Sequence, residues 1–175
     1  MVFIDESGFM LQPLLRRTWA KRGCTPTLTA WDRHDRLTCI AALTVNPKTG
    51  RIGQYFKIQR HNAKADDFLM FLFELKKQLR RPIIVIWDRL SAHRRIGRAF
   101  RELEWKGVRF EYLPAYSPEL NPVEHLWTTT KWGRLSNWAA KDITSLKDRL
   151  DSELKQQATE QSILRSHFKW AGLSA

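Results

Sequence analysis

Two short apolar segments of this chain each end in an aspartate. Residues 2–4 precede Asp5, and the apolar run at residues 83–87 precedes Asp88. In an open α/β sheet, ligands bind at the carboxyl ends of the strands. If the two segments are parallel neighbours, their carboxylates lie side by side and repel each other. A hard divalent cation such as Mg²⁺ would relieve that repulsion, so we expect a metal site at this sheet edge.

Glu124 is the third candidate ligand. It lies in the first turn of an expected helix, with Asn121 as N-cap and Pro122 at the first helical position. Residues 89–123 leave room for one helix, one strand and one loop, so the chain can return to the same sheet edge. Taken alone, Glu124 is better explained as closing a capping box with Asn121, and Asp88 could cap the helix that follows it. The joint occurrence of the three acids favours metal binding.

The elements that must position these acids follow from hydrophobic periodicity and turn residues. Strands are expected at residues 2–4, 37–45, 52–58, 83–87 and 108–113, with a further strand possible at 17–21 around Trp19. Helices are expected from an Asn62 cap to Leu79, at 92–106, from Asn121, and at 143–158. The turn at residues 46–50 makes an antiparallel hairpin, whereas a strand–helix–strand crossover makes parallel neighbours. The sequence therefore predicts one α/β domain over residues 1–175, with a mixed five-stranded sheet, antiparallel in its first half and parallel in its second, and helices on both faces.

The charge composition indicates which kind of partner the protein binds. Thirty Lys and Arg against eighteen Asp and Glu give a net charge of +12, which favours a polyanion such as DNA. A merely basic or ribosome-associated protein would show the same bias. No apolar run approaches the roughly 20 residues that span a bilayer, and the start does not resemble a signal peptide. We expect a cytoplasmic, nucleoid-associated protein that binds neither a membrane nor a nucleotide cofactor.

Three segments carry a family resemblance, namely "FIDESGF", "VIWDRLSAHR" and "LPAYSPELNPVEHLW". Together, and in this order, they resemble the catalytic segments of DDE transposases of the mariner-like group of bacterial insertion sequences. The resemblance covers nearly the whole chain, and the proline-rich segment before Glu124 is its most specific part. It implies a ribonuclease-H-like fold in which the catalytic residues Asp5, Asp88 and Glu124 hold two Mg²⁺ ions, with Mn²⁺ as a substitute. It further implies cleavage at transposon ends, transfer of the freed 3′-hydroxyl into target DNA at TA sites, and a homodimer in the active complex.

The chain departs from the family pattern at two residues and in the domain expected to precede the catalytic segments. Arg89 follows the second aspartate, where many relatives have Asn, and Thr130 replaces an apolar residue. Lys131 falls at the position of the family's basic residue. Because Asp5 lies so close to residue 1, we expect the family's N-terminal helix-turn-helix DNA-binding domain to be absent from this chain.

Outside the three acids, the candidate DNA contacts are His93, Arg94, Arg98, Arg101 and Lys131. For any one of them a solvated surface position is at least as good an explanation, and a surface histidine suits His93. Glu6 should point to the opposite sheet face from Asp5, where it is structural or supports the site indirectly. Two rival functions remain: a structure-specific nuclease or RNase H of the same fold, and a decayed or domesticated DNA-binding remnant without catalysis.

Overall fold

The computed structural model describes residues 1–30, 35–89, 93–97 and 106–174. Within these residues, five strands form one sheet in the order β3-β2-β1-β4-β5. The strands are β1 (Val2–Met10), β2 (Arg36–Val45), β3 (Ile52–Gln59), β4 (Ile83–Trp87) and β5 (Val108–Tyr112). The helices are α1 (Ala65–Leu79), α3 (Pro122–Thr128), α4 (Ile143–Thr159) and α5 (Gln161–Trp170), with the short turns η1 (Pro118–Leu120) and η2 (Thr129–Arg134). Residues 93–97 are also helical.

The sheet is mixed, as the sequence predicts. β1 pairs antiparallel with β2, and β2 pairs antiparallel with β3. β4 pairs parallel with both β1 and β5. In the parallel ladder, Val2 faces Val85 and Phe3 faces Ile86. Continuing this register for two residues would bring Asp5 level with Asp88, the residue that follows β4.

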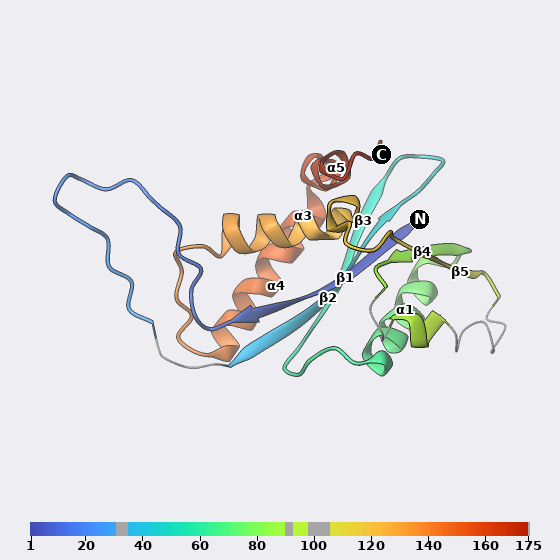
Figure 1. The fold of residues 1–175 in the computed structure, drawn as a ribbon, viewed down its shortest axis with the longest axis horizontal. Coiled ribbons are helices and arrows are strands. Elements are labelled where there is room, and N and C mark those ends of the chain that lie inside the picture. Colours follow the sequence, from blue (N-terminus) through green and yellow to red (C-terminus); the bar gives the residue numbers. More distant parts are fainter. Residues whose placement is uncertain (31–34, 90–92, 98–105, 175) are drawn as a thin grey trace.

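Helices cover both faces of the sheet, as expected (Figure 1). On one face, α3, α4 and α5 pack against a core that includes Phe3 and Phe168. On the other face, α1 and residues 93–97 cover a core that includes Ile4, Phe68 and Trp87. Alternate residues of β1 thus enter different cores, as strand geometry requires. None of the described helices is long and apolar enough to cross a membrane.

Two predictions about the first strands are wrong. β1 does not end at Asp5 but continues to Met10, because its other edge stays paired with β2 up to Arg36. The strand considered at 17–21 does not form, and these residues stay exposed and outside the sheet. Instead, residues 15–30 form an exposed arm that projects from the body, with Trp19 fully exposed (Figure 1).

Helix boundaries differ slightly from the predicted ones. The N-cap of α1 is Lys64 rather than Asn62, because the Asp67 carboxylate accepts the Lys64 backbone N–H at 2.8 Å. Beyond α4, the chain forms α5, which no sequence pattern predicted. Phe168 of α5 is 1% exposed and packs edge-on against Phe3, with ring centroids 5.6 Å apart. This contact fastens the C-terminal helix to the sheet.

A buried histidine, His167, makes stability depend on pH. His167 of α5 is fully buried, and its Nδ1 lies 2.9 Å from Nδ1 of His125. Burial, followed by the charge of His125, lowers the pKa of His167 from 6.5 to about 4. Between these two values the unfolded chain binds more protons than the folded one, so stability falls as pH falls from 6.5 to 4. The loss for this one group amounts to about 3 kcal/mol.

We expect His167→Asn to flatten the pH dependence of unfolding in that window. Urea unfolding at several pH values measures it, and the difference between wild type and variant isolates this histidine from the other titrating groups. The matched control is His61→Asn, whose histidine side chain is 59% exposed. A slope that is equally reduced in both variants contradicts the assignment to His167.

Candidate active site

The three predicted acids come from three different elements. Asp5 lies within β1 and is 8% exposed, Asp88 follows β4 directly, and Glu124 lies in the first turn of α3. Trp127 of α3 donates its indole N–H to Asp5 Oδ2 at 2.9 Å, in a fully buried hydrogen bond. Because Glu124 and Trp127 are three residues apart on a helix, they share one face. The bond that docks α3 on β1 therefore also brings Glu124 to Asp5.

The pKa shifts of Asp5 and Glu124 reflect burial and the charges of neighbouring acids. Burial, and then the charges of Glu124 and Glu6, raise the pKa of Asp5 well above its ordinary value. Burial is also the largest cause of the raised pKa of Glu124. The charge of Asp88 adds to that rise, whereas Lys131 and a hydrogen bond with the Asp5 side chain oppose it. The fold thus brings all three acids within electrostatic reach, where like charges need a proton or a cation between them.

The donor chemistry fits a hard divalent cation. Among the described residues, no three His, Cys, Asp or Glu side chains already surround one point as ligands do. Asp88 turns its Oδ1 towards His93, at 2.6 Å. The oxygens offered by Asp5, Asp88 and Glu124 are nonetheless all carboxylate, which suits Mg²⁺ or Mn²⁺. Partly buried acids with raised pKa values are also the groups that a bound cation stabilises.

The competing explanation of Glu124 as a capping residue does not hold. The backbone N–H of Asn121, which a capping box would direct at Glu124, donates instead to the Pro118 carbonyl at 2.9 Å. The Asn121 side chain caps α3 by itself, because its Oδ1 accepts the Val123 N–H at 3.2 Å. The Glu124 carboxylate is therefore available to the acid cluster.

Lys131 faces the acids from η2. Its ammonium donates to Ser7 Oγ at 2.7 Å and lies 5.2 Å from the centroid of the Phe9 ring. Burial lowers its pKa most, and the charges of Glu124 and Asp5 oppose that shift. This position puts a cation beside the carboxylates of Glu124 and Asp5.

The other predicted DNA contacts differ in how exposed the structure leaves them. The expectation of a surface histidine at His93 is wrong, because its ring is fully buried and leaves no surface for a phosphate. Arg94 is exposed, as predicted. Arg98 and Arg101 lie outside the described residues. Glu6 points away from Asp5 as expected, towards the α1 side of the sheet, where its Oε2 lies 3.7 Å from His93 Nε2.

Sequence reasoning missed the structural role of Trp127. No role was predicted for Trp127, because nothing in the local sequence tells which indole N–H bonds to a carboxylate. The only available signal was the three-residue spacing from Glu124, which places both on one helix face.

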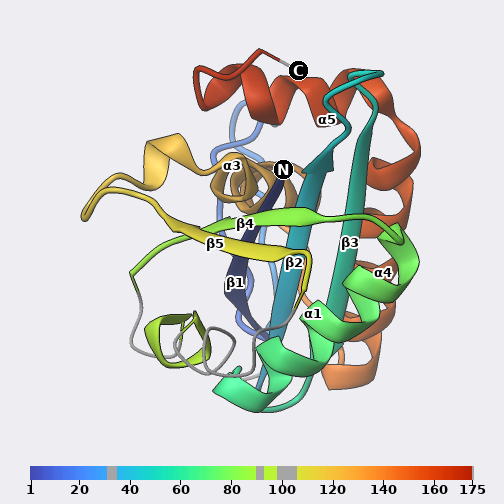
Figure 2. The ribbon, with the colours of Figure 1, turned by 90° about the vertical axis from the view of Figure 1, so that its right-hand side faces the viewer.

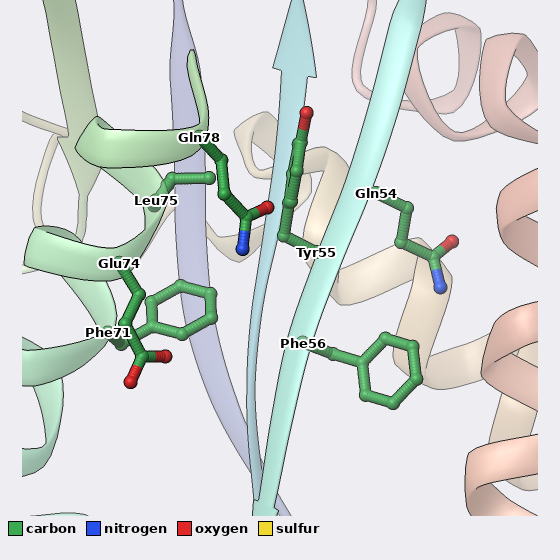
Figure 3. Close-up of a pocket in the computed structure, with 7 residues that line it drawn as sticks. All are labelled: Gln54, Tyr55, Phe56, Phe71, Glu74, Leu75 and Gln78. Carbon is green, nitrogen blue, oxygen red and sulfur yellow. The ribbon is translucent and has the colours of Figure 1, made fainter. Parts of the chain in front are cut away.

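A hollow of about 210 Å³ lies elsewhere, between β3 and α1 (Figure 3). Leu75, Gln78 and Tyr55 border it, and Glu74 is the acid in its lining. Because that lining does not bring several carboxylates together, the acid cluster remains the candidate active site.

Comparison with known proteins supports this choice. The family described as DDE superfamily endonuclease matches residues 1–147. A Mos1 transposase paired-end complex with left transposon end matches with a TM-score of 0.69 and 17% identity, over 97% of this chain and 51% of that one. A Mos1 mariner paired-end complex with Mn has a TM-score of 0.69 and 18% identity, over 98% and 52%. The Mos1 strand transfer complex has a TM-score of 0.66 and 20% identity, over 97% and 52%.

The chain spans about half the length of these solved structures. No curated protein matches it in sequence. At such low identity the solved structures establish the fold, whereas the family match covers most of the chain, including all three acids. The chain therefore belongs to the DDE superfamily of endonucleases, and its mixed five-stranded sheet has the ribonuclease-H-like fold of transposase catalytic domains.

Proposed function

We propose that this chain is the catalytic core of a transposase, which cuts DNA at transposon ends and joins the freed 3′-hydroxyl to target DNA. One observation carries the proposal: the Trp127 hydrogen bond docks α3 on Asp5, and Glu124 of α3 lies within electrostatic reach of both Asp5 and Asp88. A carboxylate cluster of this kind suits phosphodiester chemistry that proceeds without a covalent protein intermediate.

Each residue has a distinct part in the proposed reaction. Asp5, Asp88 and Glu124 are the metal ligands. When bound, two Mg²⁺ or Mn²⁺ ions supply an activated water or 3′-hydroxyl and neutralise the charge on the departing oxygen. Trp127 keeps the Asp5 carboxylate oriented through its indole N–H. Lys131 contributes a positive charge at the rim, which attracts the DNA backbone to the acids.

DNA is the proposed partner. A net charge of +12 favours phosphate contacts, which position a duplex without reading its sequence. The similar Mos1 structures are a paired-end complex with left transposon end and a strand transfer complex. In this chain, the exposed Arg94 and Arg95 follow closely after Asp88 and are candidates to contact DNA there.

We expect the double variant Arg94→Ala/Arg95→Ala to weaken DNA binding for all duplex sequences alike. Removing one or two phosphate contacts should reduce the slope of log K against log salt by about 1 to 2. Fluorescence anisotropy with an arbitrary duplex across a salt series measures that slope. The control variant Lys147→Ala/Arg165→Ala removes two exposed cations from α4 and α5. Equal loss in both variants, or tight binding to one unique sequence, contradicts the expectation.

A homodimer and insertion at TA sites complete the proposal. The arm at residues 15–30 supports the dimer, because in the described part of the chain it leaves the large apolar side chains of Leu15 and Trp19 exposed. Light scattering of the DNA-bound protein reports the oligomeric state. Sequencing of strand-transfer junctions reports the target preference.

The decisive experiment compares substrates. Purified protein is incubated with Mn²⁺ and either supercoiled plasmid, a plasmid plus a 3′-hydroxyl oligonucleotide, or an RNA–DNA hybrid. The proposal expects nicking of the plasmid and joining of the oligonucleotide to it. Faster cleavage of the hybrid would instead indicate an RNase H. A folded protein that binds no Mn²⁺ by calorimetry would indicate a DNA-binding remnant.

A further inference from the structure

The His93 ring is clamped in a fixed position. It stacks on the Trp87 indole with centroids 4.5 Å apart and an angle of 6° between the ring planes. The Phe68 ring packs edge-on against it at 4.7 Å and 89°. The ring is fully buried in the core on the α1 side. With neighbours on two sides, its nitrogens point in directions that the fold determines.

One of these nitrogens is directed at Asp88. His93 Nδ1 lies 2.6 Å from Asp88 Oδ1, a distance typical of a strong charge-assisted hydrogen bond. An ionised carboxylate only accepts, so Nδ1 carries the hydrogen and donates it. The Asp88 side chain is otherwise 52% exposed, just past the end of β4. The bond to a clamped ring restricts the rotamers of this half-exposed side chain.

The opposite nitrogen connects this pair to β1. His93 Nε2 is buried and has no hydrogen-bond partner, and Glu6 Oε2 lies 3.7 Å from it. Glu6 follows Asp5 directly in β1. The imidazole therefore lies between the carboxylates of Glu6 and Asp88. Through these side chains it connects β1 to the end of β4.

We propose that His93 is a positioning residue that holds the Asp88 carboxylate in the orientation in which it ligates metal. This inference rests on the proposed function, since Asp88 must be a ligand for its orientation to matter. Hydrogen-bond partners of metal ligands typically contribute 10- to 100-fold to metal affinity or activity. His93 does this without touching DNA or metal, which explains a histidine in a core of aromatic side chains.

Two substitutions separate positioning from packing. His93→Phe keeps a ring between Trp87 and Phe68 but removes the Nδ1 donor. His93→Asn loses the ring, but its amide nitrogen occupies nearly the position of Nδ1. If His93 positions Asp88, the Phe variant binds Mn²⁺ about 10- to 100-fold more weakly than wild type, and the Asn variant recovers part of the affinity despite a lower Tm. If His93 only fills the core, the order of the two affinities is reversed.

The experiment measures Mn²⁺ affinity by calorimetry and Tm by circular dichroism on the same samples. Should the Phe variant not fold, His93→Asn is compared with His93→Gln, whose longer side chain carries its amide past the Nδ1 position. Asn binding Mn²⁺ better than Gln supports the inference, and equal affinities overturn it. Failure of the proposed function looks different, because wild type itself would then bind no Mn²⁺.

Discussion

Replacing Asp88 with alanine is expected to lower the rate of Mn²⁺-dependent plasmid nicking by roughly 10³-fold or more, equivalent to about 4 kcal/mol of transition-state stabilisation. The three acids lie within electrostatic reach of one another, and removing one leaves too few charges to hold two ions. The fold should survive, because the Asp88 side chain is 52% exposed and lies outside β4. The local cost is the lost acceptor for His93, about 1–3 kcal/mol.

Asp88→Asn refines this test. The asparagine oxygen still accepts the hydrogen bond from His93, but the negative charge that a divalent ion needs is gone. We therefore expect the Asn variant to be as inactive as the Ala variant and more stable than it. Conversion of supercoiled to open-circular plasmid measures the activity, and thermal unfolding measures the stability.

The matched control is Asp148→Ala, which removes an exposed acid from α4 at a position where alanine is favoured in a helix. It should nick plasmid at the wild-type rate. Nicking that persists in both Asp88 variants would show that the activity comes from a contaminating nuclease or from a different site, and the proposed function would then be wrong.

Replacing Phe168 with alanine is expected to reduce the free energy of unfolding by about 3–5 kcal/mol, the usual cost of emptying a buried aromatic site. Phe168 is 1% exposed and packs edge-on against Phe3 in the core between α5 and the sheet. For a domain of this size each kcal/mol corresponds to roughly 2–4 °C, so Tm should fall by about 10 °C. Urea unfolding and calorimetry measure both quantities.

Phe73→Ala provides the comparison for this prediction. Phe73 lies in α1 and is 48% exposed, so its truncation removes the same atoms with far less loss of burial. We expect a cost below about 1.5 kcal/mol. If the two variants lose equal stability, then α5 does not form part of the core and its placement on the sheet is wrong.

Much of the fold could be predicted from local patterns. β4 matches the predicted residues 83–87, and the start of α4 at Ile143 is also as predicted. A continuous apolar run indicates a strand covered on both faces, and a helical spacing of apolar residues indicates one buried helix face. Each of these patterns lies within a single strand or helix, so it can be recognised without knowing which other elements pack against it. α5 was missed because its burial depends on a distant partner, Phe3.

The sequence by itself determined which acids could form a site: residue type, the two apolar runs and the proline-rich segment singled out Asp5, Asp88 and Glu124. Only the tertiary structure decided how they are held. Whether Asn121 leaves Glu124 available, which indole reaches Asp5 and whether His93 is buried all depend on groups distant in sequence or on backbone geometry. Hydrogen bonds and burial are set by which elements pack side by side, and local sequence patterns carry no record of that packing.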